Sequence, residues 1–288
     1  MRRRLGRLAI AASVLVAVAA AFNTFRINGV APVEVATISK EHGSIYLLGE
    51  RSELRELPDL TSISAGQTIV TGNSAGVGLR WGRGGGSLRI DANTQLEFLS
   101  PVSVRLIRGR IYFDSRALDA VTGSGVDAAD FVVETERGKV SHVGTQYMTE
   151  VKSGTLTVSV REGEVRVDKR YSAAAGQQLR LADLAAPSVT NVSRFGSAWQ
   201  WIEAMAPRLD VDGRSTYDFL QWVGRETGLE VSFASQEAEN IAHSGELRGT
   251  VATTPRQALE IWMDGELLET KIAGGKIIVS AIDLGSRQ

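Results

Sequence analysis

The stretch from Gly85 to Val167 reads GGSLRIDANTQL (85–96), VSVRLIRGRIYFDS (102–115), FVVETERGKVSHVGTQYMTEV (131–151) and LTVSVREGEVRV (156–167). In its last segment Leu156, Val158 and Val160 alternate with polar residues. This period of two is the pattern of a strand with one buried face. Residues 161–164 predict a turn, after which valines resume the alternation. The stretch therefore predicts a β framework without an evident reaction centre.

The same pattern extends over residues 35 to about 181. Apolar and polar residues alternate at 87–91 and 102–106, and single glycines recur at 138, 144, 154 and 163. Several short strands at about 8–12-residue spacing are typical of a sandwich, a barrel or a solenoid. Because no clean two-residue hairpin turn is evident, the pattern favours a β-solenoid-like stack. We expect this mainly β domain to span residues 31–185.

The chain changes in texture after residue 185. Ala185, Ala186 and Pro187 are expected to mark a boundary, and residues 186–207 to form a linker with a short helix from Ser197 to Met205. This helix carries Trp199 and Trp201, which are two positions apart and cannot share one helical face. One of the two is therefore a candidate for exposure at an interface.

Residues 208–288 predict a small α+β domain. Ser215 followed by Asp218, and Thr254 followed by Pro255 and Gln257, are signals for the starts of two helices. Glycines at 228 and 265 are expected to end them, and strands are expected at 229–233, 268–272 and 276–281. The helix residues expected to face inward are Phe219, Leu220, Trp222, Val223, Leu259, Ile261 and Trp262.

Composition limits the classes of function. The chain has 288 residues, 43% hydrophobic and 23% charged, with a formal net charge of -1. This balance is typical of a globular protein and argues against a general nucleic-acid binder, which carries a basic surface. The chain contains no cysteine, which excludes disulfides and thiolate metal sites.

The N-terminus predicts export across a membrane. Four arginines within the first seven residues precede a span without charge from residue 8 to residue 25. At about 1.5 Å per residue this span is at the lower limit for crossing a hydrocarbon core of about 30 Å. We expect residues 1–30 to form a single-pass membrane anchor with its arginines in the cytoplasm and the bulk of the chain on the far side of the membrane. A cleaved signal peptide, which would also export the rest of the chain, stays open. The anchor residues would be Leu8, Ile10, Val14, Leu15, Val16, Val18 and Phe22.

Motifs that could carry catalysis have simpler explanations. The glycine-rich stretch at 82–87 runs into a strand without the lysine of a phosphate-binding loop. His42, His142 and His243 are far apart and favour loop positions rather than a metal site. The acidic residues Glu134, Glu136, Glu150, Glu162 and Glu164 favour outward faces and turns, where charges keep strands soluble. We therefore expect no enzyme, no cofactor and no metal.

An ordered set of short motifs resembles the FecR domain over residues 64–181. The matching pieces are Ala65-Gly66-Gln67, Val70-Thr71-Gly72, Gly86-Ser87-Leu88-Arg89-Ile90, Leu106-Ile107-Arg108-Gly109-Arg110-Ile111-Tyr112-Phe113, Phe131-Val132-Val133-Glu134-Thr135, Val143-Gly144-Thr145-Gln146-Tyr147, Val160-Arg161-Glu162-Gly163-Glu164-Val165 and Ala175-Gly176-Gln177. Each piece is unspecific, but their order over the whole segment is specific.

Residues 208–281 resemble the short domain found at the N-termini of secretins and TonB-dependent receptors. The matching pieces are Phe219, Thr227-Gly228-Leu229, Gly245-Glu246-Leu247-Arg248-Gly249 and Thr254-Pro255-Arg256-Gln257-Ala258-Leu259. Together the two resemblances imply a regulator that is anchored in the inner membrane by one helix, has its bulk in the periplasm and receives a signal from an outer-membrane TonB-dependent receptor of the iron-uptake type. If the N-terminal segment is a cleaved signal peptide, the chain would instead be a soluble periplasmic protein. The resemblance implies that the signal acts on an extracytoplasmic-function sigma factor; the partner-binding residues are unknown.

The chain departs from this family pattern at its cytoplasmic end. Residues 1–7 are too few to fold as an anti-sigma domain, since about 40 residues is the usual lower bound for a lone core. The gene start could lie upstream, a separate cytoplasmic anti-sigma protein could supply the function, or this member could have lost it. The alternative function is that of an envelope structural or interaction protein without sigma-factor regulation.

Overall fold

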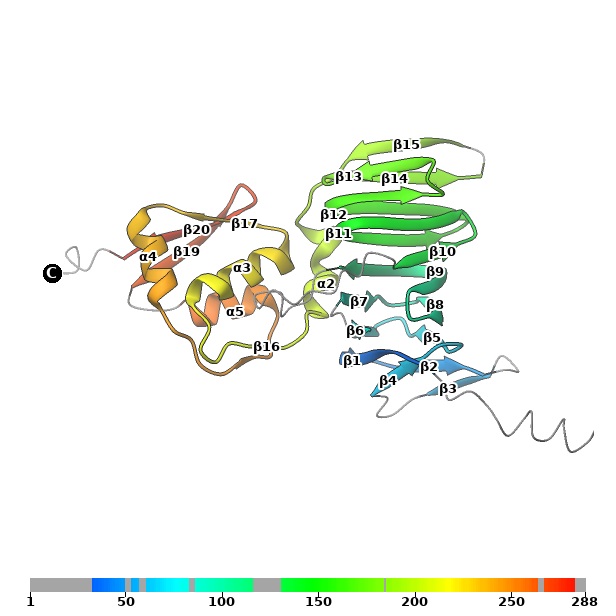
Figure 1. Ribbon diagram of the computed structural model, residues 1–288, viewed down its shortest axis with the longest axis horizontal. Helices are drawn as coiled ribbons and strands as arrows, with labels where there is room; N and C mark the ends of the chain where they lie inside the picture. The colour runs from blue at the N-terminus through cyan, green and yellow to red at the C-terminus, as the bar shows by residue number, and fades with distance from the viewer. Residues whose placement is uncertain are drawn as a thin grey trace, which may run out of the picture. The chain divides into compact units, whose positions relative to one another are not determined.

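The computed structural model describes residues 33–49, 53–56, 61–82, 86–115, 131–183, 185–263 and 267–282. The described residues from Glu34 onward belong to one compact unit, which contains two main hydrophobic cores. Figure 1 shows the strands and helices of this unit, coloured from blue to red along the chain. The larger core draws its side chains from residues 35–181, and the smaller one from residues 206–279. The expected fold class, mainly β with a small C-terminal α+β region, is confirmed.

In the described residues, fifteen strands form the larger sheet, in the hydrogen-bonded order β15-β14-β12-β11-β10-β9-β7-β6-β1-β4, with the others attached beside this path. The strands are β1 (Glu34–His42), β2 (Ile45–Leu48), β3 (Leu54–Glu56), β4 (Ser62–Ser64), β5 (Thr68–Thr71), β6 (Gly76–Trp81), β7 (Gly86–Ile90), β8 (Gln95–Ser100), β9 (Ser103–Asp114), β10 (Val132–Thr135), β11 (Gly138–Lys152), β12 (Thr155–Val167), β13 (Tyr171–Ala174), β14 (Gln177–Ala182) and β15 (Ala185–Asn191).

The predicted solenoid-like stack is wrong. Among the described strands of this sheet only β9 and β10 pair in parallel, whereas a solenoid stacks its successive coils in parallel. The missing two-residue turn also exists, because Ser153 and Gly154 join β11 to β12 with φ angles of 49° and 71°. Two positive φ angles in a two-residue loop make a tight hairpin turn. The Ser153-Gly154 dipeptide is itself a turn signal, so the sequence contained the information for this hairpin.

Three long strands bend at glycines instead of ending there. Gly109 in β9, Gly144 in β11 and Gly163 in β12 all have positive φ, and each strand changes its pairing partners near that glycine. A Cβ at Gly109 would lie 2.4 Å from the Cα of Thr94, so a side chain does not fit. The core-facing positions switch from even to odd numbers across each bend, from Val160 to Val165 in β12 for example. The turn predicted at 161–164 is therefore such a bend.

The described part of the C-terminal region, residues 206–263 and 267–282, contains two small sheets and three helices. Its elements are β16 (Leu209–Asp210), α3 (Thr216–Thr227), β17 (Glu230–Phe233), α4 (Gln236–Ser244), β18 (Thr250–Val251), α5 (Pro255–Trp262), β19 (Leu268–Ala273) and β20 (Lys276–Ala281). Both predicted capping boxes are confirmed, at Ser215 with Asp218 and at Thr254 with Gln257. Gly228 ends α3 in the left-handed conformation, as predicted. The strands pair in the order β17-β20-β19, and β16 pairs with β18.

Some local predictions in this region fail. Helix α4 was not predicted, although Ser235 caps it and Glu237 and Glu239 stand in its first turn. Ile261 was expected to face inward but is 62% exposed, because α5 turns this position away from the core that Leu259 enters. Ala185, Ala186 and Pro187 begin the exposed strand β15 instead of a linker. The expected helix from Ser197 to Met205 consists of the 3-10 helix η2 (Ser197–Trp199) and α2 (Gln200–Ala204).

Several expectations lie outside the described residues. They are the N-terminal segment with its anchor residues, part of the glycine-rich stretch, and the helix end at Gly265. None of the helices in the described ranges has both the length and the hydropathy that a membrane span needs.

Candidate functional site

The outer face of the large sheet carries polar side chains that are nevertheless buried. Arg89 of β7 pairs with Tyr112 of β9, which pairs with Met148 of β11. Arg161 of β12 lies close by, since its guanidinium carbon is 5.7 Å from the Tyr112 ring centroid. Arg89 and Arg161 are 0% and 2% exposed, so this face is covered. Alternation alone would have placed Ser87 and Arg89 in solvent.

The segment η2–α2 provides part of the cover. Trp199 and Ile202 pack with Tyr112 and Met148 in a small hydrophobic cluster. The Arg161 guanidinium lies over the Trp199 ring at 4.4 Å, a cation–π contact. Trp201 lies against Arg110 of β9 at 5.0 Å. Trp199 is buried and Trp201 is half-buried. One of these two tryptophans was expected to be exposed at an interface, but both lie against arginines of the large sheet.

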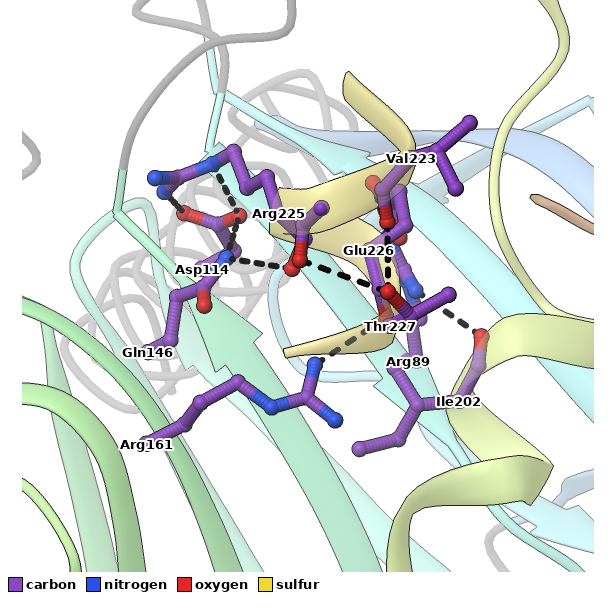
Figure 2. A network of polar contacts seen from close by, with 10 residues as sticks. Arg89, Asp114, Gln146, Arg161, Ile202, Val223, Arg225, Glu226 and Thr227 are labelled. Atoms are coloured by element: carbon purple, nitrogen blue, oxygen red, sulfur yellow. Dashed lines mark hydrogen bonds and ion pairs between the residues drawn. The ribbon is translucent and has the colours of Figure 1, made fainter. Parts of the chain in front are cut away.

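The C-terminal end of α3 provides the rest of the cover, through buried charges (Figure 2). Arg89 Nη2 lies 2.7 Å from Glu226 Oε2 of α3, and its Nη1 donates to the carbonyl of Ile202 at 2.8 Å. Arg161 donates from Nη1 to the carbonyl of Glu226 at 3.1 Å and from Nε to the carbonyl of Arg194 at 2.8 Å. Two sheet arginines therefore hold both α2 and the end of α3; we call this contact region the junction.

A second ion-pair set closes the rim of the junction. Arg225 of α3 binds Asp114 of β9 through two nitrogens and reaches Glu162 of β12 at 3.1 Å. Gln146 of β11 donates to Asp114 at 2.9 Å. Burial lowers the pKa of Arg225, but Asp114 and then Glu162 outweigh it and the pKa is raised. Arg225 therefore stays charged at any physiological pH.

A third pair joins α2 to α5. Glu203 of α2 is 4% exposed and accepts from Arg256 Nε at 2.9 and 3.1 Å. Burial raises the pKa of this carboxyl, and the nearby Arg256 offsets only part of that increase. The short helix α2 is thus held on one side by sheet arginines and on the other by a helix of the C-terminal core.

The junction is close-packed at the end of α3 and open beside it. A Cβ at Gly228 would lie 2.2 Å from the carbonyl oxygen of Arg194 and 2.8 Å from Arg161 Nε, so only glycine permits this approach. A cavity of about 330 Å³ borders it, lined by residues of β11, β12, α3 and β17. Because Arg225 and Glu162 on its wall pair with each other, this cavity belongs to the junction.

The residues singled out for chemistry are scattered. His42 lies in β1, His142 in β11 and His243 in α4, so none occupies the loop that was expected. His142 is buried within a group of aromatic rings that includes Phe113, 5.2 Å away. Within the described ranges no cluster of three or more possible metal ligands occurs. Of the acidic residues, Glu134 pairs with Arg105 and Lys139 on the surface, and Glu162 takes part in the junction.

The C-terminal sheet has an open edge at β19. In the described part of the chain β19 pairs only with β20, and Ile272 on it is 46% exposed. The Gly274-Gly275 loop makes Ala273 and Lys276 a hydrogen-bonded pair, and alternation along the strand then turns the N–H groups of Leu268, Thr270 and Ile272 outward. This edge can accept another strand.

Part of the large sheet matches the model of a known family. Residues 67–166 match the family model of the FecR protein. This FecR segment runs from before β5 into β12, and so contains Arg89, Tyr112, Asp114 and Arg161 of the junction. No protein of curated function matches the chain.

Two crystal structures of a proposed anti-sigma factor from Parabacteroides distasonis are similar at 13% identity. Their TM-scores are 0.38 and 0.35, and in both cases 75% of this chain and 99% of the other are covered.

Proposed function

We propose that this chain is a FecR-type regulator of a sigma factor. The observation that carries the proposal is the match of residues 67–166 to the FecR family model. A binding function is in line with the fold, because residues 67–166 form a packed β framework whose outer face receives other segments of the chain through charged side chains. The signal would come from a TonB-dependent receptor of the outer membrane, and the output would reach a sigma factor directly or through a separate anti-sigma protein.

The proposal includes a place in the cell envelope. Residues 1–30 would anchor the chain in the inner membrane through their charge-free apolar span, with residues 31–288 in the periplasm. Residues 208–288 would be the receptor-facing domain, in line with their resemblance to the short secretin and TonB-receptor domain.

The β19 edge is the proposed receptor contact. Outward N–H groups at Thr270 and Ile272 would pair with a strand of the receptor's signalling domain. Main-chain pairing of this kind gives affinity with little demand on sequence.

Binding of the purified full chain to receptor signalling domains tests this contact. Thr270→Pro removes one outward N–H without breaking a hydrogen bond to β20. Loss of the hydrogen bond that this N–H would donate to the receptor strand should raise the Kd at least about tenfold, which corresponds to about 1.4 kcal/mol. Thr270→Val keeps the N–H and should bind as the wild type does. Equal binding by the proline variant would exclude this edge as the contact.

A promoter reporter tests the regulatory role itself. Deleting the gene should change transcription from promoters of the sigma factor encoded nearest to it, and the full chain should restore the response to the receptor's ligand. No change with every sigma factor of the organism would contradict the proposal and favour a structural role in the envelope.

A further inference from the structure

The junction differs in kind from the two cores that it joins. Each core is built from aliphatic and aromatic side chains, whereas the junction buries Arg89, Arg161, Asp114 and Glu226 together with a cluster of four apolar residues. Covalently, the two cores are linked through residues 192–205, which include η2 and α2. A polar contact of this type resembles the interfaces that form and separate reversibly between domains.

We propose that the junction is a reversible latch. In one state α2 and the C-terminal end of α3 lie on the outer face of the sheet, and in the other they have left it. The ion pair between Glu226 and Arg89 sets the position in which the helices dock. Use of this latch in signalling rests on the proposed function, but the latch itself does not.

Burial of charge explains why such a contact can open. Taking Arg89 and Glu226 out of water costs much of what their attraction returns. When the junction separates, Arg89 and Glu226 regain their hydration. Opening the junction therefore costs less free energy than exposing an apolar face of the same size would. The pair therefore specifies how the helices dock while adding little net cohesion.

The same physics gives two substitutions with opposite effects. Glu226→Gln leaves Arg89 buried without its carboxylate partner, and this destabilises the docked state. Arg89→Met combined with Glu226→Leu replaces the pair by apolar side chains, a change that is often neutral or stabilising. If this pair specifies the docking, the junction should open in Glu226→Gln. It should stay closed in the double variant Arg89→Met with Glu226→Leu.

Spin labels on the full chain can measure the two states. The chain has no cysteine, so Ser172→Cys on β13 and Glu237→Cys on α4, both at exposed positions, introduce the two labelling sites. With Glu226 intact we expect one narrow distance distribution. Glu226→Gln should add a second distance distribution, because the population of the open state should be at least tenfold larger than with Glu226 intact. The double variant should keep the narrow distribution.

Glu97→Gln is the matched control. It makes the same change of charge outside the junction, on β8, where Glu97 pairs with Arg105 at 2.8 Å and both side chains are partly exposed. We expect no change in the distance distribution. If Glu226→Gln keeps the narrow distribution, or if the double variant opens as far as the single one, the latch is refuted.

Gly228→Ala opens the same junction by a separate route if Glu226→Gln fails to fold. It places a Cβ 2.2 Å from the Arg194 carbonyl oxygen and leaves every charge in place. The second distance population should again appear. An unchanged distance distribution in a folded Gly228→Ala variant would overturn the proposal. It would mean that the helices stay docked on the sheet even when a side chain is forced between them.

Discussion

The inner and outer faces of strands β7, β9, β11 and β12 are both buried, yet they are built differently. The inner face presents Leu88, Phe113, Tyr147 and Val158 to the large core. The outer face presents Arg89, Tyr112, Asp114, Gln146 and Arg161 to α2 and α3. One set of strands therefore carries an apolar face that holds the framework together and a charged face that receives another part of the chain.

The difference separates cohesion from specificity. Apolar packing depends on volume and tolerates many arrangements of similar side chains. A buried charge is stable only against its own partner, so Arg89 fixes the position of Glu226 and Arg225 that of Asp114. We infer that the inner face sets the stability of the sheet and the outer face sets what docks on it.

Phe113→Ala should have the largest effect on stability. The Phe113 ring is fully buried and stacks on Phe131 with centroids 3.9 Å apart. Removing it leaves a cavity in the large core and should cost about 3–5 kcal/mol of unfolding free energy. Urea unfolding followed by circular dichroism in the β region measures this loss.

Tyr112→Ala is the matched substitution on the opposite face. Tyr112 is the preceding residue and contacts Trp199 with ring centroids 6.5 Å apart. We expect the urea midpoint of the sheet to fall less than in Phe113→Ala, and hydrogen exchange in α2 to become faster. If both variants lowered the midpoint equally and left exchange in α2 unchanged, the two faces would not differ in role.

The inner face could be predicted from the sequence because its signal is local. Leu88 with Ile90, and Leu156 with Val158, alternate along single strands and all enter the core. The capping residues Ser215 and Thr254 were equally readable, since a cap involves a residue and its neighbours three positions on.

The outer face could not be predicted because its partners are distant in the chain. Arg89 looks like the solvent side of an alternating strand until Glu226, 137 residues later, is placed beside it. The glycine bends misled for a related reason. Gly144 and Gly163 read as turns because sequence alone does not show that the strand continues with a new partner beyond them.

Glu203 should give a smaller, pH-dependent effect that tests burial of charge at α2. Its pKa is raised in the folded chain by burial, despite its ion pair with Arg256. A raised pKa means that the folded state holds the proton more tightly than the unfolded one, so the associated stability is lost as pH rises through the folded pKa. We expect stability relative to Glu203→Gln to fall from about pH 4 toward neutral pH.

Urea midpoints of the wild type and Glu203→Gln, measured across this pH range, provide the test. Taking the difference between the two chains cancels the titration of all other groups that the substitution does not affect. If the stability of the wild type relative to Glu203→Gln instead rose with pH, the ion pair with Arg256 would outweigh the cost of burial. Glu203 and Arg256 would then behave more like a surface ion pair than a buried one.

Ser215→Ala should have the smallest effect, because it removes only a local contact. Ser215 accepts from the Asp218 N–H at 3.1 Å, and the Asp218 carboxylate returns to the Ser215 N–H at 3.3 Å. Loss of this cap should cost about 1 kcal/mol in the C-terminal core. Ser215→Asn should restore most of it, since asparagine caps equally well.

The same substitution also tests whether docking depends on the stability of α3, which carries Glu226 at its other end. If helix stability and docking are separate properties, hydrogen exchange in α2 should stay unchanged in Ser215→Ala. Faster exchange in α2 would mean that the junction responds to the stability of α3 as a whole and that its charges do not act alone.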